Sequence, residues 1–275
     1  MNILITGGNG YIGRHVAEYA KKFGKVVVTD IHSLSKNQKN FIELDILKNC
    51  QDKNLYQKLC KPDCIIHLAW RDGFDHKADS HLNDLPYHYA FLKNMIDSGC
   101  RSISVMGSMH EIGYFEGEVK NNTPCNPMSL YGIAKNALRQ AVMIYCKDKD
   151  VSLKWLRAFY ILGDDKNNNS IFTKILNLAQ QGKKTFPFTS GINKYDFLDI
   201  NLLSEYIVKA AIQKKICGII NLCSGEPVSL KEKVEEFILE NNLDINPDFG
   251  AFPSRDYDSP EIWGDASLIK KIVKR

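Results

Sequence analysis

The sequence predicts an α/β protein, in which a doubly wound parallel sheet is accompanied by a smaller C-terminal lobe. Two observations predict this class. Short apolar runs rich in β-branched residues alternate with amphipathic helical patterns along most of the 275 residues. A glycine-rich turn also separates the first apolar run from the first helical pattern. The hydrophobic fraction of 44% supplies enough apolar side chains for a sizeable core.

Six runs have the length and composition of buried strands. Each is short, rich in Val, Ile or Leu, and bounded by turn residues. Apolar residues at nearly every position are typical of parallel strands that are covered on both faces. The six predicted strands span residues 2–6, 25–30, 64–69, 102–108, 152–159 and 218–223.

Helical patterns fill the intervals between these runs. In 12–23, apolar residues fall on one stripe of a helix, and the same spacing returns over 83–98 and 129–147. A strand, a helix and a second parallel strand form a crossover unit. Repeated crossovers predict helices on both faces of the sheet.

The alternation loosens after about residue 163. A polar, turn-rich stretch is followed by Gly, Pro and aromatic residues, and one further helix is expected over 229–241. The expected division is a nucleotide-binding domain of residues 1–163 with returning segments at about 195–224, and a substrate lobe of residues 164–194 and 225–275.

Composition and charge argue against several classes of protein. The formal net charge is only +4 and no long block of like charges occurs, so we expect no nucleic-acid partner. No apolar run approaches the ~18 residues of a membrane span, so we expect no membrane partner. The chain runs from Met1 straight into an apolar strand without the basic segment of a signal peptide. These features predict a cytoplasmic protein.

Cysteine and histidine spacings do not indicate a metal site. The eight cysteines form no C-x-x-C pair, which predicts reduced and mostly packed thiols. His76, His81 and His88 lie near one another in the sequence, but no further ligands accompany them. We therefore expect no bound metal.

The glycine-rich turn has the spacing of a phosphate-binding loop. Gly7, Gly10 and Gly13 are three apart between a strand and a helix, and Gly8 also fits the G-x-G-x-x-G pattern. Glycine permits a tight turn and a close approach of the backbone to a pyrophosphate. The N-terminus of the following helix then offers free N–H groups to the anion. The turn predicts a dinucleotide cofactor.

Asp30 ends the second predicted strand. A carboxylate at this point accepts hydrogen bonds from the adenosine ribose hydroxyls and repels a 2′-phosphate. The sequence therefore favours NAD, with NADP as the alternative.

Tyr131 and Lys135 form a second constellation. They lie four residues apart at the start of a predicted helix, so their side chains share one face. A nearby ammonium group stabilises a phenolate and lowers the tyrosine pKa from its usual ~10. We expect this pair to exchange a proton with a carbonyl or an alcohol.

Several motifs occur together in one order along the chain: "TGGNGYIG", "HLA" at 67–69, a serine at the end of a strand, "YGIAK", "LRAFYILG" and "GIINLCSGEPVSLKE". In this combination the sequence resembles the extended short-chain dehydrogenase/reductase family of nucleotide-sugar epimerases, dehydratases and reductases. The resemblance covers essentially the whole chain. It implies a Rossmann domain followed by a substrate lobe, and a homodimer.

The resemblance also implies roles for individual residues. Ser108 would hydrogen-bond the substrate oxygen, Tyr131 would act as acid or base, and Lys135 would also bind the nicotinamide ribose. For Trp70, simple packing is an equal alternative to a cofactor contact. The cofactor-binding residues implied are Gly7, Gly10, Tyr11, Ile12, Gly13, Asp30, Asp45, Ile46, Leu68, Ala69, Trp70, Tyr131 and Lys135.

The residues after Ser108 separate the subclasses of this family. Sugar 4,6-dehydratases have an acid and a carboxylate where this chain has Met109 and His110. Because methionine transfers no proton, the sequence disfavours a dehydratase. His110 either holds a sugar hydroxyl, which we favour, or exchanges a proton beside the ketone. Glu111 lies one residue too far along, and we expect it to be structural. A Ser-His-Glu triad is not expected, because sequence neighbours rarely point at one another.

The resemblance places the substrate phosphates near Asn169 and Arg255, although Arg255 would alternatively be a surface residue. Phe186 and Phe188 either stack on the nucleotide base or fill the lobe core. We predict an NAD(P)H-dependent reductase of a nucleotide-activated 4-keto-6-deoxysugar, in bacterial surface-polysaccharide precursor synthesis. The alternatives are a nucleotide-sugar 4-epimerase and, more remotely, a non-catalytic NAD-binding regulator.

Overall fold

The larger part of the molecule is built on a seven-stranded sheet in which all neighbouring strands are parallel. The computed structural model describes residues 1–34, 39–163, 170–253 and 259–274. In spatial order the strands are β11 (Gly218–Leu222), β7 (Ser152–Ala158), β5 (Ser102–Ser108), β4 (Cys64–His67), β1 (Asn2–Thr6), β2 (Lys25–Asp30) and β3 (Phe41–Glu43).

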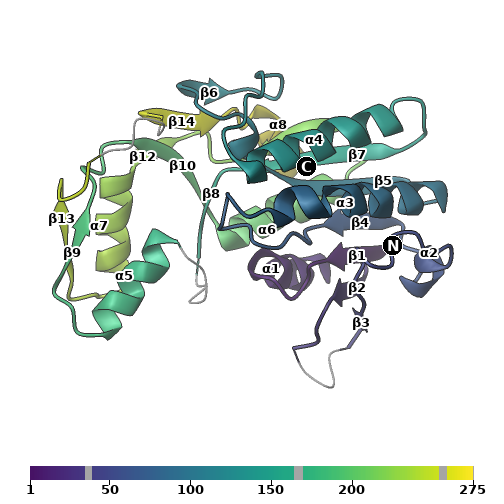
Figure 1. Cartoon of the computed structure of the whole chain (residues 1–275), viewed down its shortest axis with the longest axis horizontal. Coiled ribbons are helices and arrows are strands. Elements are labelled where there is room, and N and C mark those ends of the chain that lie inside the picture. Colours follow the sequence, from purple (N-terminus) through teal and green to yellow (C-terminus); the bar gives the residue numbers. More distant parts are fainter. Residues whose placement is uncertain (35–38, 164–169, 254–258, 275) are drawn as a thin grey trace.

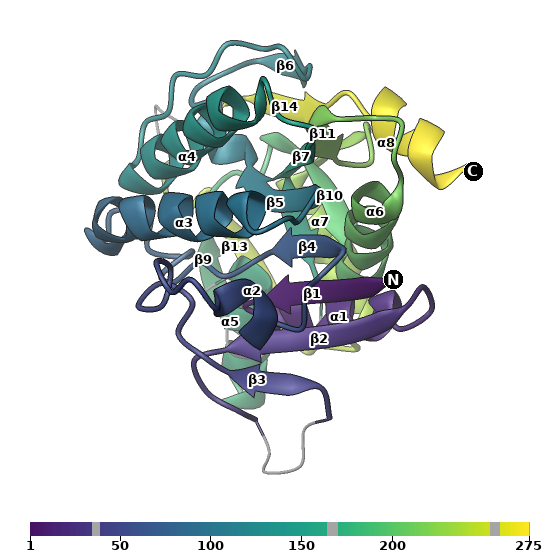
Figure 2. The same ribbon diagram turned by 90° about the vertical axis from the view of Figure 1, so that its right-hand side faces the viewer.

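Helices cover both faces of this sheet, as Figure 2 shows. One face carries α2 (Leu55–Lys58), α3 (Ser80–Asp97) and α4 (Leu130–Cys146), and the other carries α1 (Tyr11–Ala20), α6 (Ile200–Ile212) and α8 (Ser267–Val273). The predicted doubly wound fold is therefore confirmed.

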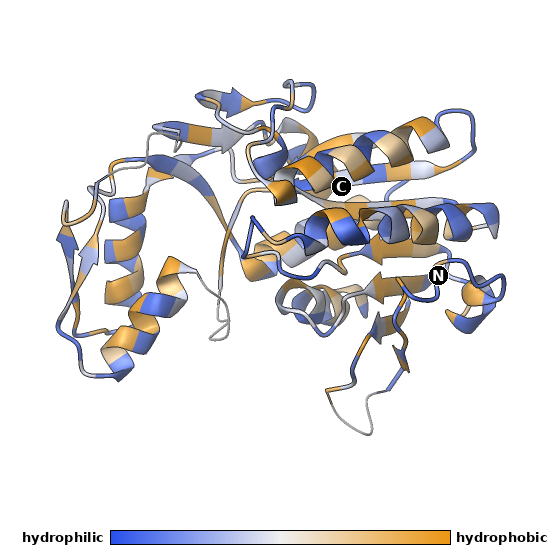
Figure 3. Ribbon diagram, in the orientation of Figure 1, coloured by the Kyte–Doolittle hydropathy of each residue, from blue (hydrophilic) through white to orange (hydrophobic). Residues whose placement is uncertain are grey.

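The sheet has a separate hydrophobic core on each face. Along β1, Leu4 packs into the core under α3 and α4, whereas Ile3 and Ile5 pack into the core under α1 and α6. All three side chains are fully buried. A strand that is buried on both faces must be apolar at every position, which explains the hydrophobic colour of β1 and β4 in Figure 3.

The six predicted strands all occur, and most of their ends agree within two residues. The first helix ends at Ala20, three residues earlier than predicted, and Phe23 is partly exposed. The reason is the turn into β2, in which a Cβ on Gly24 would lie 2.4 Å from the Met1 carbonyl oxygen. No periodic pattern in the sequence indicates β3, because this edge strand has only three residues.

A second sheet lies beside the carboxyl ends of the large one (Figure 1). Its central strand, β10 (Lys194–Asp199), carries the fully buried Asp196, whose carboxylate accepts the N–H groups of Ser224, Gly225 and Gly264. The other strands are β12 (Pro227–Ser229), β14 (Glu261–Gly264) and β6 (Gly117–Val119), and β8 (Tyr160–Leu162) also pairs with β10.

The outermost part of the molecule in Figure 1 has its own small core. It consists of α5 (Ile171–Gln180), α7 (Leu230–Glu240), β9 (Thr185–Phe188) and β13 (Asn246–Phe249). Phe186 and Phe188 are buried in this core, so they act as core residues and not as a stacking surface.

None of the helices in the described part of the chain is both long and apolar enough to cross a membrane.

Candidate active site

The glycine-rich turn is closed so tightly that side chains do not fit in it. Gly7 has φ +68°, and a Cβ there would lie 2.6 Å from the Ala69 backbone. A Cβ on Gly13 would lie 2.1 Å from the Gly7 carbonyl oxygen. Gly10 caps α1 without a side chain, which leaves the N-terminus of the helix open to an anion. The turn therefore has the form that a pyrophosphate requires.

Asp30 ends β2 beside this turn. Its carboxylate accepts hydrogen bonds from the backbone N–H of Asn9 at 3.0 Å and of Ile31 at 2.8 Å. These bonds fix the carboxylate at the edge of a large cavity, which it also lines. A negative charge held at this point suits ribose hydroxyls and disfavours a phosphate group.

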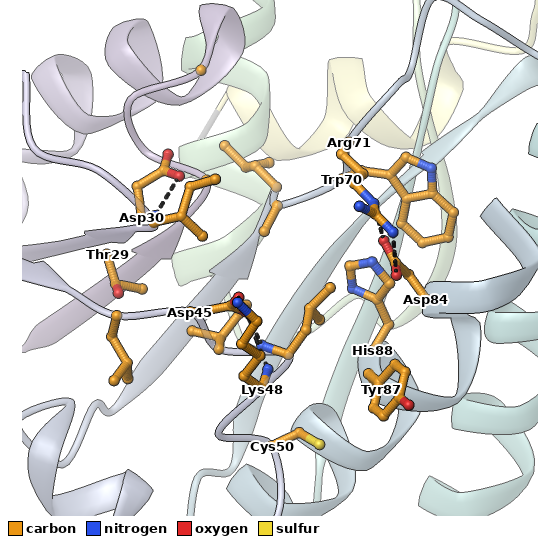
Figure 4. Close-up of a pocket in the computed structure, with 18 of the residues that line it drawn as sticks. Thr29, Asp30, Asp45, Lys48, Cys50, Trp70, Arg71, Asp84, Tyr87 and His88 are labelled. Carbon is orange, nitrogen blue, oxygen red and sulfur yellow. Dashed lines mark hydrogen bonds and ion pairs between the residues drawn. The ribbon is translucent and has the colours of Figure 1, made fainter. Parts of the chain in front are cut away.

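The cavity has a volume of about 820 Å³ and runs along the carboxyl ends of β1, β2 and β4. Figure 4 shows Asp30 and Asp45 at one end of it, and Trp70 and His88 at the other. Its size and its glycine cradle fit a dinucleotide. The predicted cofactor residues that line it are Gly7, Gly10, Asp30, Asp45, Ile46, Leu68, Ala69 and Trp70.

Five predicted cofactor residues are not among the lining residues of this cavity. Tyr11 and Ile12 begin α1 and pack against the adjoining core, and Gly13 lies against the turn. Tyr131 and Lys135 instead contact Trp70, which is part of the cavity wall.

The sequence did not indicate the cavity wall beyond Trp70. Arg71 and Asp84 form a bidentate ion pair there, and Tyr87 and His88 stand next to them (Figure 4). These residues come from the loop after β4 and from α3, and no local motif marks them.

Ser108 is the last residue of β5 and caps the short 3₁₀ helix η1 (Met109–Glu111). Its Oγ accepts the His110 N–H at 3.3 Å, and its side chain interacts with the Tyr131 phenol, an interaction that lowers the tyrosine pKa. The side chain is almost completely buried. The structure thus brings the predicted serine and tyrosine into direct contact.

Tyr131 and Lys135 lie on the first two turns of α4, which begins after Ser129. The Ser129 hydroxyl accepts the Gly132 N–H, and the Tyr131 N–H donates to the His76 carbonyl at 3.2 Å. Lys135 Nζ donates to the Met106 carbonyl at 2.8 Å and lies 3.8 Å from the centre of the Trp70 ring. Trp70 is therefore a contact of the candidate catalytic lysine as well as part of the cavity wall.

The protonation of this pair differs from the prediction. Burial raises the pKa of Tyr131 to about 12, with a smaller contribution from the negative charge of Glu111. Burial also lowers the pKa of Lys135 to about 7, which Glu111 partly opposes. Desolvation disfavours the charged form of both groups. The expectation that the lysine lowers the pKa of Tyr131 is therefore wrong for the protein without ligands.

Three histidines surround the Tyr131 ring. The His76 ring is nearly parallel to it with centroids 5.1 Å apart, and the His81 and His110 rings lie edge-on at 5.2 and 6.0 Å. Trp70 Nε1 donates to His81 Nδ1 at 3.0 Å, so the His81 proton resides on Nε2, which faces the Asp75 carbonyl. Burial lowers the pKa of His110 to about 4, so this ring is neutral near pH 7.

Two more histidines extend this cluster below Trp70. His67 Nδ1 is 2.8 Å from the Thr6 hydroxyl, and His67 Nε2 is 3.0 Å from His88 Nδ1. The His88 ring stacks on Trp70 with centroids 4.5 Å apart. Burial lowers the pKa of His67 to about 3 and that of His88 well below its usual value. Both rings are therefore neutral supports for Trp70.

Two predicted substrate contacts, Asn169 and Arg255, lie outside the described residues. His110 is half-buried beside Tyr131 and His76, with 4.2 Å between the two imidazole centroids. The sequence drew attention to His76 and His81 but assigned them no contact with Tyr131.

Comparison with known proteins agrees with this geometry. The model of the NAD dependent epimerase/dehydratase family matches residues 3–223. The dTDP-6-deoxy-L-talose 4-dehydrogenase (NAD(+)) of Aggregatibacter actinomycetemcomitans is 46% identical over 271 residues, which cover 96% of this chain and 99% of that protein.

Solved structures share the fold at lower identity. One is a UDP-glucose-4-epimerase from Stenotrophomonas maltophila with NAD and formylated UDP-arabinopyranose bound. It has a TM-score of 0.84 at 21% identity, and the match covers 100% of this chain and 92% of that chain. A UDP-glucose 4-epimerase from Thermotoga maritima, with UDP-glucose, has a TM-score of 0.83 at 20% identity, over 98% and 92% of the two chains.

The family match spans the glycine cradle, Asp30, Ser108, Tyr131 and Lys135. It confirms the predicted enzyme family and NAD as the cofactor. The chain belongs to the NAD dependent epimerase/dehydratase family.

Proposed function

We propose that this protein is a reductase of a nucleotide-activated 4-keto-6-deoxysugar. One observation carries the proposal: Tyr131 and Lys135 both contact Trp70 in the wall of the cofactor cavity, and Ser108 interacts with the Tyr131 phenol. A protonated phenol is the form that a ketone reductase needs. The 46% identical relative is named for the same redox change at C4 of a dTDP-6-deoxysugar, written in the direction of oxidation.

The residues of the site hold the ketone in place and transfer a proton to its oxygen. Bound NADH supplies a hydride to the carbonyl carbon. Ser108 and Tyr131 donate hydrogen bonds to the carbonyl oxygen, and the phenolic proton passes to that oxygen as negative charge develops on it. The product is the 4-hydroxyl, and Tyr131 is left as a phenolate. Lys135, with a pKa of about 7, then stabilises the phenolate and returns a proton to it.

The surrounding rings position the sugar. His110 and His76 border Tyr131, and the low pKa of His110 keeps its imidazole neutral, able to accept or donate a hydrogen bond to a sugar hydroxyl. Asn169 and Arg255 remain the proposed contacts of the substrate phosphates, because amide and guanidinium groups donate to phosphate oxygens.

A nucleotide-sugar 4-epimerase is the second candidate, because it needs the same serine, tyrosine and lysine. The solved epimerases support the shared fold only. A non-catalytic NAD-binding regulator requires neither Tyr131 nor Lys135, and this chain has both in contact with the site.

We also propose that the enzyme is a cytoplasmic homodimer. All eight cysteines are free thiols in the structure, as expected of a reducing compartment. The adjacent helices α3 and α4 expose Leu82, Ile133 and Ile144, which a second copy would cover. Light scattering should give twice the mass of one chain, and a monomer at micromolar concentration would contradict the dimer.

The stoichiometry of the cofactor tests the proposed function. With a panel of nucleotide-linked 4-ketosugars, the protein should oxidise one NADH for each sugar reduced, because the hydride ends on C4. The reduced nicotinamide absorbance and the product are measured together. A 4-epimerase would instead convert one 4-hydroxy nucleotide sugar into its epimer with no net absorbance change, and that result would refute the reductase.

Replacing the Tyr131 hydroxyl tests its role as the acid. Tyr131→Phe should lower kcat about 10²–10⁴-fold, as expected for loss of a general acid. NADH affinity should stay within about twofold, since the ring is retained and the hydroxyl faces Ser108. Stopped-flow turnover and NADH fluorescence titration measure the two effects. Turnover near that of the parent protein would remove Tyr131 from the mechanism.

The charge at Asp30 tests the choice of cofactor. The parent protein should have a higher kcat/KM with NADH than with NADPH, and Asp30→Ala should reduce that preference. A tenfold preference corresponds to about 1.4 kcal/mol. Asp148→Ala, at an exposed carboxylate, is the matched control. A tenfold preference of the parent protein for NADPH would overturn the assignment.

A further inference from the structure

A buried carboxylate, that of Glu111, lies directly behind Ser108. Its side chain is fully buried. Oε1 accepts the Ser108 N–H at 2.7 Å and the Trp155 indole N–H at 2.8 Å. Oε2 lies 3.5 Å from Arg139 Nε and 3.6 Å from Arg157 Nη2. One side chain thus connects η1, β7 and α4 at the point where the candidate catalytic serine is presented.

The end of β5 is built around this carboxylate. A Cβ on Gly107 would lie 2.6 Å from Glu111 Oε1 and 2.2 Å from Trp155 Nε1. Any side chain at 107 would therefore displace the carboxylate from the Ser108 N–H. Glu111 and Ser108 also form a reciprocal capping box, in which each side chain accepts a backbone N–H across the same turn.

Stability alone does not call for a charge at this position. Burying a carboxylate and two guanidinium groups has a desolvation cost that their attraction only partly offsets, and an apolar cluster of similar volume is often as stable. The carboxylate does, however, provide two fixed acceptors and a negative charge close to the reaction centre. Both are useful to an enzyme that must place Ser108 and control the proton of Tyr131.

We propose that Glu111 is a positioning residue of the reaction, which fixes Ser108 through its backbone N–H and places a buried negative charge near the Tyr131 phenol. The inference rests on the proposed function, since it assigns Tyr131 the part of a proton donor. It goes beyond the purely structural role that the sequence indicated for Glu111.

The surroundings of Tyr131 support the electrostatic part. The negative charge of Glu111 raises the pKa of both Tyr131 and Lys135. The other titratable groups that face Tyr131 are Lys135 on its own helix and three histidines from η1, α3 and the loop before α3: His110, His81 and His76. None of these brings a negative charge, so the charge of Glu111 opposes that of the Lys135 ammonium group at the phenol.

Two variants separate the charge from the geometry. Glu111→Gln keeps an oxygen that can accept from Ser108 and Trp155 but removes the negative charge, so the Tyr131 pKa should fall by about one unit. Arg139→Gln removes a positive charge from the other side of the carboxylate, so the Tyr131 pKa should rise. A general loss of structure would not move the pKa in opposite directions.

The readout is the titration of Tyr131 with NAD⁺ bound, taken as the difference in tyrosinate absorbance between each protein and its Tyr131→Phe counterpart. The positive charge of NAD⁺ should lower this pKa and so ease its measurement. The same shift should appear in the pH profile of kcat for oxidation of the nucleotide-sugar alcohol. In this oxidation kcat rises with pH as the phenolate forms. The rising part of the pH profile should therefore move to lower pH in Glu111→Gln.

The geometric part predicts a loss in kcat. Glu111→Leu removes both acceptors, so kcat should fall about 10–100-fold while KM for the sugar stays within about threefold. Glu111→Gln keeps an acceptor for the Ser108 N–H, so its kcat on the plateau of its pH profile should be close to that of the parent protein. If Glu111→Leu does not fold, the charge pair Glu111→Gln and Arg139→Gln still decides the proposal.

Asp196→Asn is the matched control, because Asp196 is an equally buried carboxylate that accepts several N–H groups. It should lower the unfolding temperature without moving the Tyr131 titration. Identical titrations for the parent, Glu111→Gln and Arg139→Gln proteins would overturn the proposal. Since the titration needs no sugar, a failure to reduce any 4-ketosugar would refute the proposed function separately.

Discussion

The parallel pairing of β4 with β5 is the constraint on which the site depends. Their register places His67 opposite Val105, so both strands end at the same edge of the sheet. Trp70 follows the end of β4, and Ser108 ends β5. The crossover helix α4 begins at this edge. Its first two turns place Lys135 against the Trp70 ring and Tyr131 beside Ser108. A candidate cofactor wall and a proton donor therefore meet because two buried strands run in the same direction.

Desolvation decides the protonation states at this edge. Burial keeps Tyr131 protonated, lowers the pKa of Lys135 to about 7, and keeps His67, His88 and His110 neutral. In such a site, hydrogen bonds to a developing negative charge are stronger than in water, because the donors are fixed and little solvent screens them. The same burial makes every unpaired charge costly, which explains why Glu111 lies between two arginines.

The histidines illustrate how one aromatic side chain organises several polar ones. Trp70 donates to His81, stacks on His88 and lies over the Lys135 ammonium group. Each contact uses a different part of the indole: the N–H, one face and the ring electrons. A smaller residue would keep the cavity but would leave the lysine without this support. Trp70 thus packs against these groups and also lines the candidate cofactor cavity.

The sequence by itself determined the features that depend on local patterns of residues. Apolar runs indicated six of the seven strands of the large sheet, the glycine spacing indicated the phosphate cradle, and helical periodicity put Tyr131 and Lys135 on one face. Only the tertiary structure decided which partners these groups meet. Glu111 finds Arg139 and Arg157 on other elements, and His76 reaches Tyr131 from a distant loop. The pKa of Tyr131 is raised and not lowered as the local spacing predicted. The reason is burial, which depends on contacts between segments far apart in the chain.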